Sequence, residues 1–439
     1  TSYRTPGGFG IRVDGGCGGV GTVISPYYDS LLVKVTSWDN TFPGVCHKAA
    51  RALGEVRVRG VKTNVPFVTN ILTHPTFIAG KCSTKFIDET PELFEITESR
   101  DRATRVLKYI ANIQVANPNA ERSQFDTPRF PPVTGERGEG LKPLLDREGP
   151  EALSKWVLGQ KKLLVTDTTM RDAHQSLLST RMRTRDMLKA AEGTSEIESD
   201  CFSLEMWGGA TFDAAFRFLH EDPWERLEML RERIPNIPFQ MLLRGANAVG
   251  YTNYPDNVIR KFVDESAKAG IDIFRIFDSL NWIPGMSVSM DEVLKLGKFC
   301  EATICYTGDI LDPTNDKFTL KYYVDMAKEL EKRGAHAIAI KDMAGLLKPY
   351  AAKALVTALK QEVGVPIHLH THDTTANQVA SVLMAAEAGV DIADLAISSM
   401  SSLTSQPSLN AVVAALGGQE RDTRSEERRV GKECRTVCR

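Results

Sequence analysis

The sequence has 439 residues, more than one domain of ordinary size holds, so we expect two or three domains. Its hydrophobic content of 42%, charged content of 25% and net charge of −2 are typical of a globular protein and exclude a basic field for nucleic acid or membrane. No apolar run approaches the ~20 residues of a membrane-spanning helix. No signal peptide is recognisable at Thr1, and the eight cysteines contain no CxxC pair, so we expect reduced thiols and a cytoplasmic location.

Residues 1–95 combine glycine-rich turns with short predicted strands at Val20–Ser25 and Ser30–Val35 and a helix around His47–Leu53. A G-x-G-x-x-G pattern occurs here at Gly16, Gly18 and Gly21. A dinucleotide-binding fingerprint requires a strand before this pattern and a helix after it. Because the chain continues as strand and turn, we interpret these glycines as hairpin turns.

Residues 96–160 form the next region. Apolar residues at helical spacing predict a helix over Glu98–Ile113. From Asn117 to Gly149 the composition changes to proline, glycine and charge, which is typical of a linker. A second helix is predicted over Glu151–Leu158.

From residue 161 to about 420, apolar runs of strand length alternate with amphipathic segments such as Leu320–Leu330. Eight such runs fit a (β/α)8 barrel, the α/β fold that spans about 250 residues. The runs are Leu163–Thr168, Cys201–Met206, Phe239–Leu243, Ile273–Phe277, Ala302–Tyr306, Ala337–Ile340, Ile367–Thr371 and Ile392–Ile397.

Polar residues follow nearly every run, at the end where such barrels carry their active sites. His370 and His372 are two apart, so both imidazoles would point to one face of a strand. With Asp172 after the first strand they could hold a divalent ion and leave positions open. Lys341 is either paired with a buried aspartate or converted by carbon dioxide into a carbamate ligand. Arg244 offers a fork for a carboxylate, or a salt bridge within the barrel.

The tail from Arg424 onward breaks all preceding periodicity. Read back into codons, Arg424–Cys434 matches a widely used sequencing adapter, whereas the alternative is a charged solvated tail. We expect residues 424–439 to carry no function.

Several long segments closely resemble the pyruvate carboxylase family. In the barrel region these are Asp167–Ser176, Leu204–Asp213, Phe239–Tyr251, Ile340–Pro349 and His368–Thr374. Residues 1–95, with Tyr27–Lys34 and Arg59–Asn64, resemble the C-terminal part of its biotin carboxylase domain. Residues 96–160 resemble its linker and tetramerisation region, and 161–420 its carboxyltransferase barrel.

The resemblance implies roles for individual residues. Asp172, His370, His372 and a carbamylated Lys341 would hold zinc or manganese. Arg244 and Gln175 would bind the carboxylate and keto oxygen of pyruvate, in a pocket that also includes Arg171, Ala173 and His174. Asp213 and Tyr251 would line the biotin pocket. The implied catalytic set is Lys341, Arg244, Gln175 and Asp213, and the implied reaction is carboxylation of pyruvate to oxaloacetate by carboxybiotin.

The resemblance also implies a biotinyl carrier domain as partner, a homotetramer, and a mitochondrial matrix location in a eukaryote. We expect the chain to be a fragment without the ATP and magnesium site, the carrier lysine and the proton-shuttling threonine, and thus inactive overall by itself. Thr375–Ala376 and Ser402 depart from the family, which has Ser-Gly and glycine there. The alternatives are a subunit of oxaloacetate decarboxylase or transcarboxylase type, an acyl-CoA lyase or synthase, which also uses a His-x-His barrel, and a catalytically inactive fragment. The biotin carboxylase remnant disfavours the decarboxylase and lyase families.

Overall fold

The computed structural model describes residues 2–16, 18–24, 31–96 and 137–424. The chain divides into two compact units, Thr1–Asp126 and Thr127–Arg439, and each is described by itself. The predicted helix over Glu98–Ile113 and nearly all of the tail lie outside the described residues.

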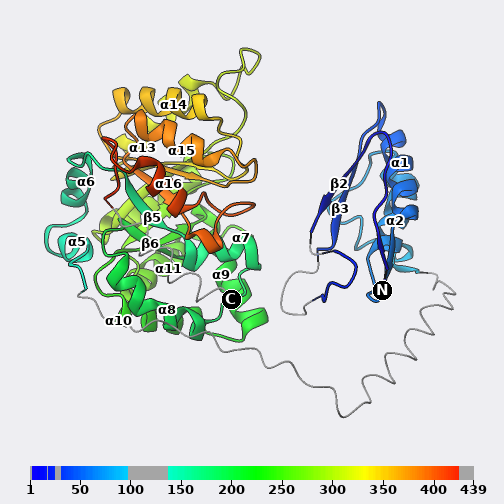
Figure 1. Ribbon diagram of the computed structural model, residues 1–439, viewed down its shortest axis with the longest axis horizontal. Helices are drawn as coiled ribbons and strands as arrows, with labels where there is room; N and C mark the ends of the chain where they lie inside the picture. The colour runs from blue at the N-terminus through cyan, green and yellow to red at the C-terminus, as the bar shows by residue number, and fades with distance from the viewer. Residues whose placement is uncertain (1, 17, 25–30, 97–136, 425–439) are drawn as a thin grey trace, which may run out of the picture. The chain divides into compact units, whose positions relative to one another are not determined.

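The first unit is a small α+β unit (Figure 1). Strand β2 pairs antiparallel with β3, and β1 pairs antiparallel with β4. Thr41 is the N-cap of helix α1, and its hydroxyl accepts a hydrogen bond from Gly44 N. Its elements are β1 Ser2–Arg4, β2 Ile11–Gly15, β3 Val33–Ser37, α1 Phe42–Glu55, β4 Arg57–Arg59, α2 Val65–Thr73, α3 Pro75–Ile78 and the 3-10 turn η1 Pro91–Phe94.

Three outcomes follow for this unit. The predicted helix around His47–Leu53 is confirmed as part of α1. The prediction of a strand at Val20–Ser25 is wrong for the described residues of this segment, which form a turn and irregular chain between β2 and β3. Gly16 and Gly18 donate their N–H groups to Leu32 O in that same connection, so the hairpin interpretation of the glycines is confirmed.

The second unit is a closed barrel of eight parallel strands, in the order β10-β11-β12-β5-β6-β7-β8-β9. This confirms the predicted (β/α)8 fold, because each strand overlaps one of the eight apolar runs. Both faces of the strands are buried, as their near-continuous apolar character requires. The strands are β5 Leu164–Asp167, β6 Ser203–Trp207, β7 Phe239–Leu243, β8 Ile273–Ile276, β9 Phe299–Cys305, β10 Ala337–Asp342, β11 Ile367–Thr371 and β12 Ile392–Leu395.

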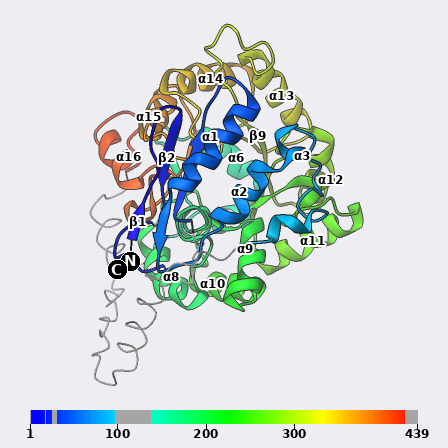
Figure 2. The same ribbon diagram turned by 90° about the vertical axis from the view of Figure 1, so that its right-hand side faces the viewer.

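Helices surround the barrel, as the view along it shows (Figure 2). Their apolar faces pack on alternate strand residues, for example Tyr323 and Ala327 of α13 in the same core as Ile338 and Ile340 of β10. The longer helices are α8 Thr184–Ile197, α10 Pro223–Arg233, α11 Asp256–Ala269, α12 Ile283–Lys295, α13 Leu320–Lys332, α14 Pro349–Glu362, α15 Gln378–Glu387 and α16 Leu409–Leu416.

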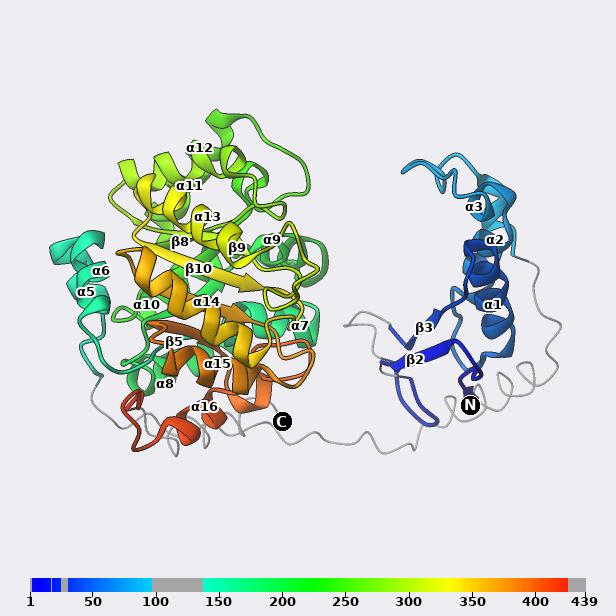
Figure 3. The same ribbon diagram turned by 90° about the horizontal axis from the view of Figure 1, so that it is seen from above.

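Two short helices, α5 (Lys142–Glu148) and α6 (Pro150–Leu158), close the amino-terminal end of the barrel. Their leucines form a cluster with the first residues of several strands, and β10 points away from them (Figure 3). This burial corrects the linker prediction for 142–148, because Leu141 and Leu145 gain enough apolar contact to hold a helix in a segment rich in proline, glycine and charge.

Because α5 and α6 occupy one end, the other end holds the polar side chains. Alternate residues of the strands point into the barrel, and those near the carboxyl ends are Glu205, Lys341 and His370. The short elements that follow the strands there are the π-turn η2 Thr169–Ala173, α7 His174–Leu178, α9 Gly209–Ala214, the π-turn η3 Ala215–Leu219, and the 3-10 turns η4 Gly245–Asn247 and η5 Ser398–Met400. None of the described helices is long and apolar enough to cross a membrane.

Candidate metal and substrate site

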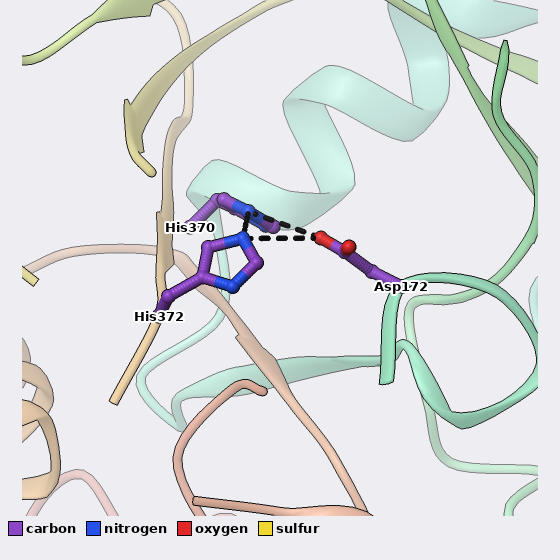
Figure 4. A group of neighbouring side chains, drawn as sticks. All are labelled: Asp172, His370 and His372. Carbon is purple, nitrogen blue, oxygen red and sulfur yellow. Dashed lines mark hydrogen bonds and ion pairs between the residues drawn. The ribbon is translucent and has the colours of Figure 1, made fainter. Parts of the chain in front are cut away.

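Asp172, His370 and His372 come together at the carboxyl end of the barrel (Figure 4). His370 lies close to Asp172 because only β12 separates β11 from β5 in the closed barrel. The two Nε2 atoms lie 3.2 Å apart, and one carboxylate oxygen of Asp172 lies 3.3 Å from the first and 3.4 Å from the second. The spacing of two residues thus brings both imidazoles to one point, as the strand geometry predicts.

Hydrogen bonds on the far side of each ring fix which nitrogen carries the proton. His372 Nδ1 donates to the carbonyl oxygen of Thr404 over 2.6 Å, and His370 Nδ1 donates to Asp394 over 2.5 Å. Each Nε2 atom therefore carries no proton, and its lone pair faces the Asp172 carboxylate. Three acceptor atoms at 3.2 to 3.4 Å from one another could hold a cation between them. Two imidazole nitrogens and one carboxylate oxygen suit a divalent transition metal.

Electrostatics keep these groups in the protonation states that a metal requires. Burial raises the pKa of Asp172, but the Arg171 guanidinium beside it outweighs burial and holds that pKa well below the usual range. Burial and then the charge of Lys341 lower the pKa of His370 well below its usual value. The carboxylate is consequently ionised and the His370 imidazole neutral at pH 7.

Lys341 is buried beside this group, with Nζ 3.0 Å from His370 Nε2. It forms no ion pair with any described carboxylate. Its neighbour Asp342 instead accepts hydrogen bonds from Leu346 N, Leu347 N and Thr371 Oγ1. Burial lowers the pKa of Lys341, against the opposing effect of Asp172. The alternative of a buried Lys–Asp ion pair at Lys341 therefore finds no partner among the described residues.

Arg171 lies next to the same group but is already engaged. It is 2% exposed and pairs with Asp172 at 3.1 Å, with Glu205, and with Gln175 Oε1 at 3.2 Å. Only its Nε–H has no described partner. Arg171 thus holds the Asp172 carboxylate in place and keeps one donor free, while Gln175 is half-buried beside it.

The other two residues of this predicted pocket segment lie in the interior. Ala173 is fully buried in the apolar core. His174 donates from Nε2 to Met170 O, and burial lowers its pKa to about 3. Within the described part of the chain, neither residue hydrogen-bonds to Asp172, His370 or His372, so both are packing residues at the start of α7.

A second cluster forms where β6 and β7 end. The Arg244 guanidinium donates to Gly250 O at 3.1 Å and lies 5.5 Å from the centre of the Tyr251 ring. Tyr251 Oη in turn donates to Asp213 at 3.3 Å, and Asp213 also pairs with Arg217. The structure thus groups Arg244, Tyr251 and Asp213, although no hydrogen bond or ion pair among the described residues joins this cluster to Asp172, His370 or His372.

Sequence reasoning missed a buried ionic network inside the barrel. Arg275 pairs with Glu301 and Asp394, and Asp394 also accepts hydrogen bonds from His368 and His370. All five residues have no exposed surface. A charged residue in the middle of an apolar strand run, as Arg275 is in β8, was the available signal, because a buried charge needs a partner.

Gln406, beyond β12, was missed as well. Its amide donates to Asp172 Oδ2 at 3.0 Å and its carbonyl accepts from Thr168 Oγ1 at 2.8 Å. It therefore fixes the carboxylate from the side opposite Arg171. No motif or periodicity pointed to this glutamine, since it lies in an irregular loop.

Comparison with known proteins agrees with this geometry. Residues 1–89 match the biotin carboxylase C-terminal domain family, and residues 312–432 match the HMGL-like family. The chain is 54% identical to the pyruvate carboxylase of Bacillus subtilis over 426 residues, which cover 96% of this chain and 37% of that protein. It is 50% identical to the human mitochondrial enzyme, covering 98% of this chain and 37% of the relative. The chain corresponds to one part of the pyruvate carboxylase sequence.

Solved structures of pyruvate carboxylase from Rhizobium etli give the same result. The complete multifunctional enzyme matches all of this chain and 43% of its own chain, with a TM-score of 0.69 and 51% identity. A carboxyl transferase domain determined with pyruvate matches 77% of this chain and 58% of its own, with a TM-score of 0.71 and 52% identity. The chain thus spans well under half the length of the curated pyruvate carboxylases it matches.

Proposed function

We propose that the barrel catalyses the carboxyltransferase half-reaction of pyruvate carboxylase, the transfer of a carboxyl group from carboxybiotin to pyruvate, which yields oxaloacetate. The observation that carries this proposal is the cluster of Asp172, Lys341, His370 and His372 at the barrel mouth. The similarity to pyruvate carboxylases supports it over a decarboxylase or transcarboxylase subunit, because the match extends through residues 1–89.

The chain's own residues would bind and orient pyruvate. Arg244 keeps most of its donors free and would hold the carboxylate. Gln175 and the free Nε–H of Arg171 would meet the keto oxygen. A divalent ion at Asp172, His370 and His372 would supply a Lewis acid for the charge that develops on that oxygen. We propose that this ion is zinc or manganese.

Lys341 would become the fourth ligand by carbamylation. Its neutral amine attacks carbon dioxide, a nitrogen–carbon bond forms, and one proton leaves the nitrogen. The lowered pKa of Lys341 raises the fraction of the reactive amine. A carbamate, the Asp172 carboxylate and two neutral imidazoles would together balance the charge of a divalent ion, which the ammonium form cannot do.

Asp213 and Tyr251 would line the entrance for biotin, which a carrier domain would deliver. Both residues are accessible where β6 and β7 end, and Tyr251 is 69% exposed. In the whole protein the carrier, the ATP and magnesium site and a homotetramer would complete the cycle. Relatives of this chain include bacterial and mitochondrial enzymes, so cytoplasm and mitochondrial matrix are the proposed locations.

The test uses the chain as it is. Calorimetry would measure the binding of oxalate, a planar mimic of the pyruvate enolate, to chain loaded with Mn²⁺ and to chain stripped with a chelator. Metal-dependent oxalate binding is expected. Oxalate binding that ignores the metal, or no binding by either form, would refute the proposed substrate class.

A further inference from the structure

Two adjacent glycines, Gly208 and Gly209, lie where β6 ends and α9 begins, against two arginine side chains. A Cβ on Gly209 would lie 2.7 Å from Cζ and Nη1 of Arg244, closer than real Cβ contacts come. A Cβ on Gly208 would lie 3.1 Å from Cδ of Arg171. Neither glycine has a left-handed backbone, so the missing Cβ matters here for the space it leaves and not for conformation.

We propose that Gly209 is a positioning residue for Arg244. The space left by its missing Cβ holds the guanidinium against the end of β6, with its unpaired donors directed to a substrate carboxylate. The chemical identity of that ligand, a small α-keto or dicarboxylate anion, rests on the proposed function. The placement of Arg244 by Gly209 is a separate claim, since it depends only on the packing of these two residues.

Few contacts hold the Arg244 guanidinium in place, so its position depends on the space beside Gly209. Among the described residues only Gly250 O accepts a hydrogen bond from its guanidinium, and the Tyr251 ring lies 5.5 Å away. A guanidinium carries five donors, so four remain for a ligand. Arg244 is half-buried and forms no ion pair in the described chain. A side chain held by so few contacts moves when its space is filled.

Arg171 presents the opposite case and supplies a contrast. Its guanidinium is buried and paired with Asp172 and Glu205, so it cannot yield to a new methyl group. Gly208→Ala therefore strains a locked side chain and lowers the melting temperature. Gly209→Ala meets only the far end of a flexible side chain, so the fold tolerates it and Arg244 moves instead.

The experiment measures oxalate binding to the Mn²⁺-loaded chain. Gly209→Ala is expected to weaken it about tenfold or more, the cost of losing a charge-assisted contact. Metal affinity and melting temperature should stay at parental values. Gly159→Ala is the matched control, because it adds the same methyl in the same unit with only ordinary contacts at 3.4 Å and beyond. This control should bind oxalate as the parent does.

A double-mutant cycle isolates the route of the effect. Lysine has no guanidinium fork to meet the new methyl, so Gly209→Ala in an Arg244→Lys background should cost no further affinity. A full additional loss in that background would show that Gly209 acts on something other than Arg244 and would overturn the inference.

A crystal structure of Gly209→Ala supplies a readout that does not depend on the ligand. The hydrogen bond from Arg244 to Gly250 O should be broken and the guanidinium displaced. A guanidinium unmoved beside the new methyl would overturn the inference. If the parent binds no oxalate, the proposed function fails, while the position of Arg244 in this structure still decides the role of Gly209.

Discussion

Asp394 Oδ2 lies 2.5 Å from Nδ1 of His370 and thereby turns the other nitrogen of that ring toward Asp172 and His372. Asp394 is itself held by Arg275 and His368, all fully buried. A carboxylate behind a ligating histidine fixes both its tautomer and its orientation, and such outer partners affect metal affinity strongly.

Asp394→Asn is accordingly expected to weaken Mn²⁺ binding by roughly 10- to 100-fold. An amide keeps the size of the side chain but no longer holds the imidazole with a full negative charge. Isothermal titration would measure the dissociation constant, with the exposed Asp316→Asn as control. An unchanged constant for Asp394→Asn would mean that Asp394 balances Arg275 and does not orient His370.

Arg244→Ala should abolish or weaken oxalate binding by about tenfold or more, because a charge-assisted bidentate contact is lost. The fold should persist, since the Arg244 guanidinium makes one hydrogen bond to the described residues. In the full-length enzyme the same change should raise the KM for pyruvate or stop turnover. Arg185→Ala removes an exposed arginine and serves as the control. Parental affinity in Arg244→Ala would make this arginine purely structural.

Carbamylation of Lys341 can be observed directly. Metal-loaded chain in ¹³C-bicarbonate should give a carbamate carbon signal, and that signal should be missing in Lys341→Gln. Lys348→Gln, which removes an exposed lysine paired with Asp309, should keep it. A parent without the signal, and with Mn²⁺ affinity that does not respond to carbon dioxide, would leave Lys341 as an unmodified amine.

Ala376, with φ 58°, and Ser402, with φ 67°, have left-handed backbone conformations that favour glycine. A Cβ in this region is strained, so Ala376→Gly and Ser402→Gly should each raise stability by about 1 kcal/mol. Chemical denaturation would measure this. Ala358→Gly in helix α14 has ordinary helical geometry and should instead lose about 1 kcal/mol. A loss at all three positions would contradict the strain argument.

Stability should depend on pH through Asp167. Burial raises its pKa to about 6, against the opposing hydrogen bonds from Thr169. The folded state then binds the proton more tightly than the unfolded state, whose pKa is about 3.9. The contribution of Asp167 to the free energy of unfolding is therefore full below about pH 4 and is lost as pH rises through about 6.

The neutral variant Asp167→Asn removes the loss of stability that occurs when Asp167 ionises. It keeps an oxygen to accept from Thr169 and should be more stable than the parent at pH 8, by up to about 3 kcal/mol. The gain should shrink as pH falls from 6 to 4. Melting curves across this range would measure it, and a gain that does not vary with pH would exclude Asp167 as the titrating group.

The sequence by itself determined the barrel, because eight apolar runs alternating with amphipathic segments allow few other folds. It also predicted that Asp172, His370 and His372 meet at the barrel mouth, since residue type, the i,i+2 spacing of His370 and His372, and the strand-end position of Asp172 are local properties. The helix over 142–148 escaped it, because this helix depends on the packing of Leu141 and Leu145 against the strands they cover.

Tertiary structure alone decided how these residues act. Closure of the barrel brings Asp394 of β12 behind His370 of β11. It leaves Lys341 without a carboxylate partner among the described residues, while Asp342 accepts hydrogen bonds from backbone amides. Gly209 leaves room for Arg244 only because β6 and β7 lie side by side. Hydrogen bonds and steric contacts are set within a few tenths of an ångström, and residues far apart in the chain reach such distances only once the barrel has closed.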